Sequence, residues 1–525
     1  MKYFTLHETC PLLIAITFYI FSSISFYLKK EKLSVILLLL ASFFTAFFVA
    51  NLDPFLNVWD ERFHALVAKS LTQHPLKPIL IENPLFGYEK SNWAYNHIWL
   101  HKQPLFLWQI ALSIKLFGLN ALAVRLPSII LHTLTTLLVF QIGKNLVNFK
   151  TGFLAAFLFS LSHFSLELIS DHFPTDHNDV AFLFYVTLSF WAWIKYVQTK
   201  KLKWIILIGF AAGAAVLVKW LLGLLIFPIW TITILSKING NRFFIKDFIP
   251  LVISGLVSVV VFLPWQIYIF NEFPSEALYE YKMNSKRLFE VVEGHSGTWI
   301  YHFDKLQTLY GQNIGYFIIP IIGIVLLTLQ TKAKEYKILI VSSVVIIYGL
   351  FTLSPTKMLA YPYVVSPFIF LGFISLLFFI REKLLIYIHK KLVAETIICL
   401  LFIWFCWDTF KFPRVIELHT FSNIHKNHDR ALHLAEQKVI HHLLENYNQS
   451  DQLLFNVKIT THGNISTMFY TNHNCFEFIP TQEQINEVLA KKYKVLVFDY
   501  GQLPNYLVNN KNVKLIDVKS LVQSN

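Results

Sequence analysis

The chain has 525 residues, of which 55% are hydrophobic and only 15% are charged. A soluble globular protein carries about 25% charged residues, so this composition excludes that class and indicates a membrane protein. The formal net charge is +13, which in a soluble protein would favour a nucleic-acid partner. Here the basic residues fall in short loops between apolar runs, so we attribute the charge to membrane topology and expect no nucleic-acid partner.

Apolar runs of about 17–22 residues, long enough to cross the hydrocarbon core of a bilayer, recur along the chain. We therefore expect an all-α polytopic membrane protein with about 12 transmembrane helices. The first run lacks a small-residue cleavage site and a second follows almost at once, so we expect it to be retained rather than removed as a signal peptide. The expected spans cover residues 11–28, 34–51, 126–142, 153–169, 180–197, 204–218, 220–236, 249–270, 313–330, 338–353, 362–380 and 392–409.

Every second loop between these spans is short and basic, and the positive-inside rule places such loops in the cytoplasm. One alternate connection is a tight turn at Lys219, and it faces outward in this scheme. The other outward segments cover residues 52–125, 170–179, 271–312 and 354–361.

The apolar stretch 104–118 does not fit the alternation of spans and loops. It is short and contains Lys115, and counting it as a span would place every later basic loop outside. We therefore expect an amphipathic helix that lies at the outer interface. Trp93, Trp99 and Trp108 nearby are typical of the aromatic belt at the headgroups.

Beyond residue 410 the sequence becomes polar. Residues 451–457 and 494–500 have the pattern of buried strands, and residues 481–492 that of a helix with Thr481 as its N-cap. We find no catalytic motif in this part of the chain. The expected domains are a transmembrane domain, residues 1–409, and a small extracytoplasmic α/β domain, residues 410–525.

Carboxylates gather at the expected outer ends of the spans. Asp60 and Glu61 follow the second apolar run, and Asp179 opens the fifth expected span behind "TDHN". An acid at the edge of a span is usually functional or paired, so acids here could act on a substrate at the membrane surface. The simpler alternative is that they end helices and face water. We select Asp60, Glu61 and Asp179 as the candidate catalytic residues.

Three lysines lie near the same outer ends, against the trend of the positive-inside rule. Lys102 begins the expected interfacial helix, Lys219 stands alone between two apolar runs, and Lys357 lies in "SPTKMLA". Any one of them could be a lysine that extends its charge to the interface. Three lysines with acids opposite indicate a bound anionic headgroup, such as a lipid-linked phosphate or diphosphate.

Histidines and cysteines give no sign of a metal centre. His163, His172 and His177 cluster around the second outward loop, and His295 lies in "EGHSG". Their spacing matches no compact zinc motif, so we interpret them as hydrogen-bonding loop residues and expect neither a metal nor a cofactor. The 4 cysteines form no CxxC pair, and we expect no disulfide framework.

Several stretches follow one another in an order that is familiar from a known family. They are "WDE…HALVAKSL", "HKQPLFLWQIALSIKLFGLNALAVRLPS", "TDHNDVAFLF", "VKWLLGLL", "LPWQIYIF…EGHSGTWIYH" and "TKMLAYPYVVSPF". Together, from about residue 50 to about residue 380, they resemble the polytopic GT-C class glycosyltransferases of the protein O-mannosyltransferase and lipid A aminoarabinose transferase group.

The resemblance implies a sugar donor on a polyprenyl phosphate, taken from the outer leaflet. It implies that Asp60 is the essential acid of the first outward loop and Lys102 the contact to the donor phosphate. The second acid then matches Asp179, with Asp176 as the weaker match. The chain departs from the aminoarabinose transferases after the acid pair, where Phe63 and His64 replace the usual Arg and Tyr, and where "HKQP" replaces the common "EKPP".

The expected activity is therefore that of a hexosyl- or pentosyltransferase in a bacterial inner membrane, with its active site facing the periplasm or outside. Its partners would be membrane lipids, the lipid-linked donor and an acceptor, which is lipid A, another surface glycan or a protein. Glycosyl transfer requires a stabilised leaving group and usually a base for the acceptor. Asp60 would deprotonate an acceptor hydroxyl or, with an ionised phosphate acceptor, position groups around the sugar.

Two other classes of function compete with an enzyme. A transporter or flippase of a lipid-linked sugar tends to place charges at the bilayer midplane and to show repeated halves. Here the charges lie at outer span ends, and we detect no repeat. A lipid-binding scaffold with a sensor domain fits the C-terminal region but gives no reason for the ordered outward motifs.

Overall fold

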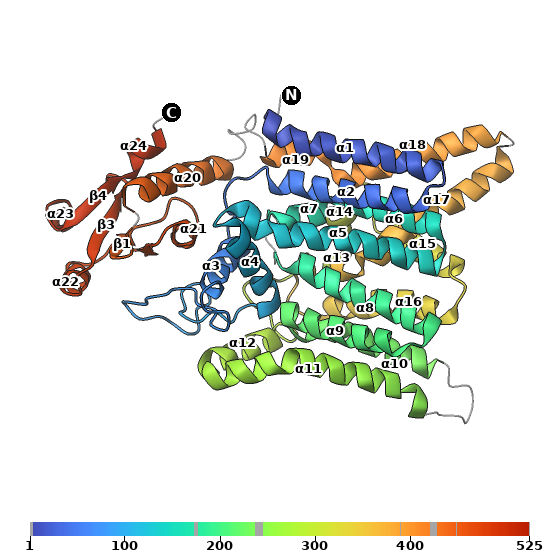
Figure 1. The fold of residues 1–525 in the computed structure, drawn as a ribbon, viewed down its shortest axis with the longest axis horizontal. Coiled ribbons are helices and arrows are strands. Elements are labelled where there is room, and N and C mark those ends of the chain that lie inside the picture. The colour runs from blue at the N-terminus through green and yellow to red at the C-terminus, as the bar shows by residue number, and fades with distance from the viewer. Residues whose placement is uncertain are drawn as a thin grey trace.

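Long helices run side by side in one bundle, and a small region with a β-sheet lies beyond one end of it (Figure 1). We call this end the sheet end of the bundle. The computed structural model describes residues 4–172, 177–236, 245–388, 390–419, 428–447 and 449–523.

The bundle alternates direction from helix to helix, as a polytopic membrane protein requires. Side-chain caps mark the starts of two of its helices. Asn120 and Asn148 accept hydrogen bonds from the backbone N–H groups of Ala123 and Thr151, and so cap α5 and α6. The bundle helices are α1 (Leu6–Tyr27), α2 (Glu31–Ala50), α5 (Ala121–Leu146), α6 (Phe149–Ser160), α7 (His163–Ile169), α8 (Asp179–Thr199), α9 (Leu202–Lys219), α10 (Ile226–Leu235), α11 (Ile249–Glu272), α15 (Ile318–Gln330), α16 (Lys334–Leu353), α17 (Ser366–Tyr387) and α18 (Lys391–Phe410).

The expected spans all coincide with helices, and the all-α polytopic prediction is confirmed. Within the described ranges, 9 helices are long and apolar enough to cross a membrane, or up to 10 if the bent pair α6 and α7 is one span. The sequence analysis predicts about 12 because it treats two segments differently: it counts a short helix as a span and divides a long stretch into two spans. One is α15, an apolar helix of 13 residues. The other is the 34-residue stretch Leu202–Leu235.

This stretch contains a reversal rather than one long helix. Helix α9 ends at Lys219, Trp220 has a φ of +57°, and a 3-10 helix, η1 (Trp220–Leu225), leads into α10. A Cβ on Gly223 would lie 2.4 Å from the backbone nitrogen of Val216, so only glycine allows η1 to fold back against the end of α9. The predicted tight turn at Lys219 is therefore confirmed.

Two short helices, α3 (Asp60–Leu71) and α4 (Pro104–Phe117), lie across the sheet end instead of along the bundle (Figure 1). The placement of α4 agrees with an interfacial helix. The expected aromatic belt is wrong for one member, because Trp99 is fully buried and its ring stacks near that of Phe63 in α3. Trp108 donates from its indole N–H to the carbonyl of Pro75 at 2.7 Å.

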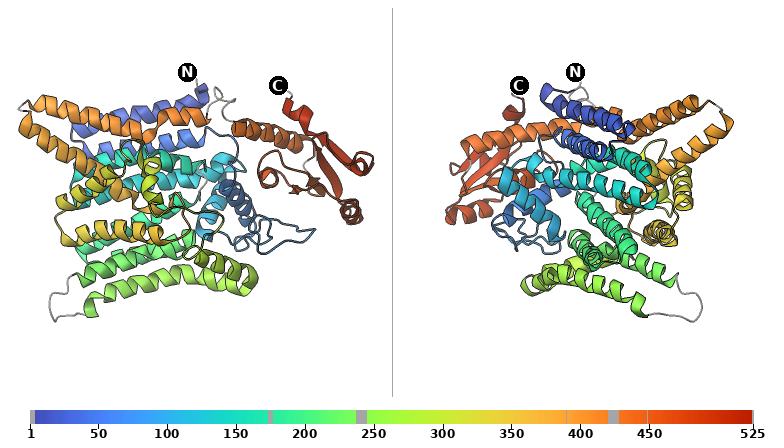
Figure 2. Two further views of the ribbon diagram at one scale, coloured as in Figure 1. Left: turned by 180° about the vertical axis from the view of Figure 1, so that it is seen from behind. Right: turned by 45° about the vertical axis from the view of Figure 1, so that its right-hand side comes forward.

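The basic loops that follow α1, α8 and α17 all lie at the end of the bundle away from the sheet (Figures 1 and 2). This arrangement is what the positive-inside rule requires, since these loops must share one side of the membrane. Of the shorter helices, α12 (Pro274–Lys286) and α19 (Phe412–His419) lie toward the sheet end (Figure 1). The others are α13 (Tyr301–Asp304), α14 (Leu306–Tyr310) and η3 (Tyr361–Val365).

The C-terminal region is a small parallel sheet with helices, as predicted. Its strands stand in the order β2-β1-β3-β4, and β1 pairs with β3 so that Leu454 faces Leu496. Thr481 caps α22 with a capping box that also uses Gln484. The elements are α20 (His428–Asn446), β1 (Gln452–Phe455), α21 (Gly463–Tyr470), β2 (Asn474–Cys475), α22 (Gln482–Ala490), β3 (Lys494–Asp499), α23 (Asn505–Val508), β4 (Val513–Asp517) and α24 (Val518–Gln523).

The apolar core does not stop at the end of the bundle. One cluster of buried side chains includes Phe48 of α2, Phe63 of α3 and Phe469 of α21. Helix α3 is thus packed between the bundle and the C-terminal region, and this places its first residue, Asp60, at a junction of both parts. The boundary between the predicted domains, residues 1–409 and 410–525, stays a prediction.

Candidate functional site

Asp60 and Lys102 form an ion pair at the sheet end. Asp60 is the first residue of α3, where the helix dipole favours a negative charge, and it follows Trp59 with a φ of +68°. Lys102 lies two residues before Pro104, which begins α4. The Lys102 Nζ is 3.3 Å from the Asp60 Oδ1, and both side chains are partly exposed, at 11% and 16%. The starts of α3 and α4 therefore bring Asp60 and Lys102 together. These are the residues to which the resemblance assigns the essential acid and the phosphate contact.

Asp179 and Lys219 form a second acid–lysine pair at the same end. Asp179 is the first residue of α8, and Lys219 is the last residue of α9, at the reversal into η1. The Lys219 Nζ also lies over the ring of Tyr361, 5.3 Å from its centroid. Asp176, the weaker match for the second acid, lies outside the described residues.

A cavity of about 430 Å³ opens beside the two pairs, and we call it the lysine cavity. Lys102, Lys219 and Arg287 contribute its cations, and Tyr281, Asn284 and Gln266 contribute neutral polar groups. Its apolar wall includes Leu221, Leu222, Phe262, Phe270, Leu350 and Phe351. A site that is cationic in one part and apolar in another suits a phosphate carried by a hydrocarbon chain.

The sequence analysis missed Arg287, although it lies in the outward segment 271–312. Arg287 caps the C-terminal end of α12, and its guanidinium donates to Glu293 at 2.6 Å. Burial favours the neutral form of Glu293, but the charge of Arg287 outweighs it and lowers the pKa of this carboxyl. The sequence did contain a signal for it. Lys286 and Arg287 are two adjacent basic residues in an outward segment, where the positive-inside rule expects few.

Glu61 does not face the lysine cavity. Its side chain is fully buried and accepts hydrogen bonds from the guanidinium of Arg125 at 2.6 and 2.9 Å and from the backbone N–H of Asn57 at 2.6 Å. The catalytic role expected of Glu61 stays a prediction, and the buried pair with Arg125 favours a structural role instead. Successive helical residues point about 100° apart, so Asp60 can reach Lys102, which lines the cavity, while Glu61 holds α3 against α5.

Lys357 also differs from its expected place. Its side chain is 4% exposed, and its Nζ donates to the carbonyls of Phe351 and Thr352 at 2.8 and 2.7 Å. These carbonyls belong to the last turn of α16, where unpaired acceptors and the helix dipole attract a cation. Lys357 therefore stabilises a helix end, and the structure brings Lys102 and Lys219, rather than Lys357, to the cavity.

Two of the predicted loop histidines, His177 and His295, make contacts near the site residues. His177 Nδ1 is 3.5 Å from the Nδ1 of His64, whose Nε2 is 3.9 Å from the Asp60 Oδ1. Burial lowers the pKa of His177 to about 3, so this ring is neutral at physiological pH. His295 contributes its backbone carbonyl to the N–H of Lys357 at 2.9 Å. The His295 contact is made by the backbone, so the hydrogen-bonding role of the histidine side chains stays a prediction.

The chain is similar to known proteins in part of its sequence and in most of its fold. Residues 101–268 match the family described as Dolichyl-phosphate-mannose-protein mannosyltransferase. An uncharacterised protein of Aquifex aeolicus (strain VF5) is 30% identical over 195 residues, which are 37% of this chain and 34% of that protein. The match thus spans about a third of the relative's length.

The solved structures of similar fold are membrane enzymes. ArnT from Cupriavidus metallidurans in the apo state superposes with a TM-score of 0.57 and 15% identity, covering 92% of this chain and 89% of that chain. The same protein bound to undecaprenyl phosphate matches with the same score and covers 92% and 90%. The apo oligosaccharyltransferase of Archaeoglobus fulgidus has a TM-score of 0.54 at 12% identity, covering 85% of this chain and 65% of that chain.

The family match contains Lys102, Asp179 and Lys219, and the fold match covers nearly the whole chain. The fold comparison confirms the polytopic fold predicted from the sequence, and the family match agrees with the predicted class of glycosyltransferase. The chain is a multi-pass integral membrane protein with the GT-C fold, similar to ArnT and to the dolichyl-phosphate-mannose-protein mannosyltransferases.

Proposed function

We propose that this protein transfers a sugar from a polyprenyl-phosphate donor to an acceptor at the outer face of the membrane. The observation that carries the proposal is the pairing of Asp60 with Lys102 and of Asp179 with Lys219 beside the lysine cavity. A similar fold binds undecaprenyl phosphate in ArnT, which supports a donor of that class here.

The cations of the lysine cavity stabilise the leaving group. When the bond between the sugar and the phosphate breaks, negative charge grows on the phosphate oxygens. Lys102, Lys219 and Arg287 are already held in place by ion pairs, so they stabilise this charge with little reorganisation. The apolar wall of the cavity receives the first isoprene units of the carrier.

Asp60 acts on the acceptor or on the sugar. Its charge is balanced by Lys102. A bound donor phosphate competes for Lys102, which leaves the carboxylate of Asp60 able to accept a proton from an acceptor hydroxyl. With an acceptor that is already an ionised phosphate, the same carboxylate stabilises positive charge on the sugar in the transition state. Asp179 holds Lys219 in place at the lysine cavity.

The active site faces the periplasm or outside in this proposal, because the basic loops at the other end of the bundle face the cytoplasm. Lipid A, another surface glycan and an envelope protein are the acceptor classes that this side offers. The cavity lies among helix ends rather than at the middle of the bundle, which favours an enzyme over a flippase.

The test combines cells and purified protein. Mass spectrometry of lipid A, surface polysaccharide and envelope proteins should reveal a sugar that is lost without this protein and in Asp60→Asn, and is retained in the exposed-loop control Lys201→Ala. The purified protein should then release polyprenyl phosphate from that donor in detergent micelles, where no second leaflet exists. Unchanged glycans in all fractions, or donor movement in vesicles without any transfer in micelles, would overturn the proposal.

A further inference from the structure

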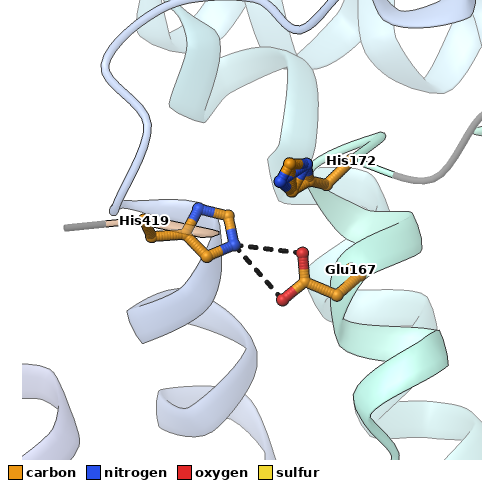
Figure 3. A group of neighbouring side chains, drawn as sticks. All are labelled: Glu167, His172 and His419. Carbon is orange, nitrogen blue, oxygen red and sulfur yellow. Dashed lines mark hydrogen bonds and ion pairs between the residues drawn. The ribbon is translucent and has the colours of Figure 1, made fainter. Parts of the chain in front are cut away.

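Three potential metal ligands from distant parts of the chain meet next to the sheet end (Figure 3). Glu167 lies in α7, His172 follows it in the second outward loop, and His419 is the last residue of α19. Their ligand atoms all lie within 4.8 Å of one another. Glu167 and His419 are 252 residues apart in sequence, so no local motif announces the group.

His419 is held in the orientation that metal-binding histidines adopt. Its Nδ1 lies 3.0 Å from the Oδ2 of Asp53, and its Nε2 lies 3.0 and 3.2 Å from the two oxygens of Glu167. A carboxylate on one ring nitrogen fixes the tautomer and directs the other nitrogen toward a metal. Asp53 is itself anchored by an ion pair with Arg430 and by the side-chain amide of Asn57 at 3.2 Å.

His172 supplies an independent sign that a ligand is needed here. Its ring lies beside that of His419, with centroids 4.9 Å apart, and near the carboxylate of Glu167 (Figure 3). Its Nε2 atom is buried and has no hydrogen-bond partner among the residues that the structure describes. A buried polar atom without a partner is unfavourable, and coordination to a metal would satisfy it.

We propose that Glu167, His172 and His419 bind a Zn²⁺ ion. Two imidazole nitrogens and one carboxylate are a donor set that zinc prefers, and Asp53 supplies the outer carboxylate that such sites place behind a histidine. Glu167 has a further histidine neighbour, His163, whose Nδ1 is 3.8 Å from the Glu167 Oε1. His163 also lines an open cavity of about 430 Å³.

The proposed ion has a structural role that is separate from the lysine cavity. None of its ligands belongs to the acid–lysine pairs, so this proposal does not depend on the proposed transfer reaction. The ion would join α7 and the second outward loop to α19, the helix after which the chain continues into the C-terminal region. It would also correct the expectation, drawn from sequence spacing alone, that the histidines bind no metal.

A metal-free explanation of the same geometry exists, and the experiment must separate the two. A protonated His419 between the carboxylates of Asp53 and Glu167 would satisfy all three groups without an ion. It would leave His172 without a function in the group. Metal binding that depends on His172 therefore distinguishes a zinc site from a simple imidazolium bridge.

The full-length protein, purified in detergent and stripped with a chelator, is titrated with Zn²⁺ and with Co²⁺. We expect about one tightly bound Zn²⁺ per chain by elemental mass spectrometry and a visible Co²⁺ spectrum with nitrogen ligands. His172→Ala and Glu167→Gln should each weaken Zn²⁺ binding by at least about 10-fold. The control is His441→Ala, because His441 is exposed and pairs only at the surface with Glu445.

Size-exclusion chromatography and circular dichroism show whether each variant is folded. His172→Ala is the decisive variant. The Nε2 of His172 makes no hydrogen bond to the described residues, so its removal should leave the fold intact. A wild-type protein that binds no Zn²⁺ after equilibration would overturn the proposal. The same conclusion follows if folded His172→Ala binds Zn²⁺ and Co²⁺ as tightly as wild type.

Discussion

Asp60 and Glu61 are neighbours in sequence but have different surroundings. Asp60 pairs with Lys102 beside the lysine cavity, where both side chains retain some exposure to solvent. Glu61 is fully buried in its pair with Arg125. Charge has a different effect in the two places, because a partly exposed pair contributes about 0–1 kcal/mol to stability while a broken buried pair leaves a costly unpaired charge.

For Asp60→Asn we expect transfer to slow by about 100-fold or more, if Asp60 accepts the acceptor proton. The amide keeps the shape and loses the basicity. The midpoint of thermal unfolding in detergent should stay near that of wild type, since the pair with Lys102 is partly exposed. Near-wild-type turnover by folded Asp60→Asn would leave this residue only as a charge at the N-terminus of α3.

For Glu61→Gln we expect a loss of stability of about 3–5 kcal/mol, because Arg125 would remain buried without its counter-charge. Thermal unfolding or protease resistance in detergent measures this loss. Activity per folded molecule should change far less than in Asp60→Asn. A Glu61→Gln protein that is as stable as wild type but inactive would instead return Glu61 to the catalytic group.

Lys102→Ala should weaken the binding of the donor by about 1.5–3 kcal/mol, because a phosphate loses a charge-assisted contact. Lys102→Arg should recover part of the loss, since the guanidinium keeps the charge with another geometry. The readout is the KM for the lipid-linked donor. The control is Lys357→Ala, whose side chain does not line the lysine cavity and whose Nζ donates to carbonyls at the end of α16: its KM should stay near wild type while its stability falls. Equal donor KM values in Lys102→Ala and wild type would remove Lys102 from the site.

At the scale of the elements, α3 is the connection between the site and the C-terminal region. Arg62 lies two residues after Asp60, is fully buried, and donates to Glu436 of α20 at 2.7 and 3.4 Å. It also donates to Thr460 at 2.7 Å and to the carbonyl of Thr461 at 2.9 Å. Helix α3, which begins with Asp60, is thus bound through Arg62 to residues about 370–400 positions later in the chain.

This contact predicts that the C-terminal region positions α3. Arg62→Met should destabilise the protein by about 3–5 kcal/mol, and Glu436→Gln should do likewise, because each leaves a buried charge. In a double-mutant cycle we expect a coupling energy of about 0.5–3 kcal/mol between them, measured by thermal unfolding. Additive effects of the two changes would show that Arg62 and Glu436 do not act as a pair in the folded protein.

At the scale of the whole molecule, α3, α4 and the C-terminal region share one end of the bundle (Figures 1 and 2). The lysine cavity is lined by Lys102, just before α4, and by the end of α9. The basic loops lie at the other end. The membrane normal therefore runs along the bundle, and the orientation that we propose from the positive-inside rule places the site at the outer surface.

Cysteine labelling tests this orientation in a variant that lacks the native cysteines. Asn509→Cys, at an exposed position of the C-terminal region, should react with an impermeant maleimide in intact cells. Lys201→Cys, at an exposed position between α8 and α9, should react only after the membrane is opened. The reverse pattern would overturn the orientation and would place the lysine cavity in the cytoplasm.

The spans, the turn at Lys219, the interfacial helix 104–118 and the strands near 451 and 494 could all be predicted from the sequence. Each depends on local quantities: the length of an apolar run, the charge of a loop, or the alternation of apolar residues. The resemblance carried by the outward motifs also assigns Asp60, Lys102 and Asp179 to one site. The two ion pairs beside the lysine cavity agree with that prediction.

Only the tertiary structure decided which charged residues face the cavity and which are buried. Glu61 is matched by Arg125, 64 residues away, and Lys357 is used by the end of α16. Arg287 enters the lysine cavity, and His419 meets Glu167 across 252 residues. Sequence spacing carries no information on such contacts, because the environment of a charged side chain is set by the segments packed around it, and those segments come from distant parts of the chain.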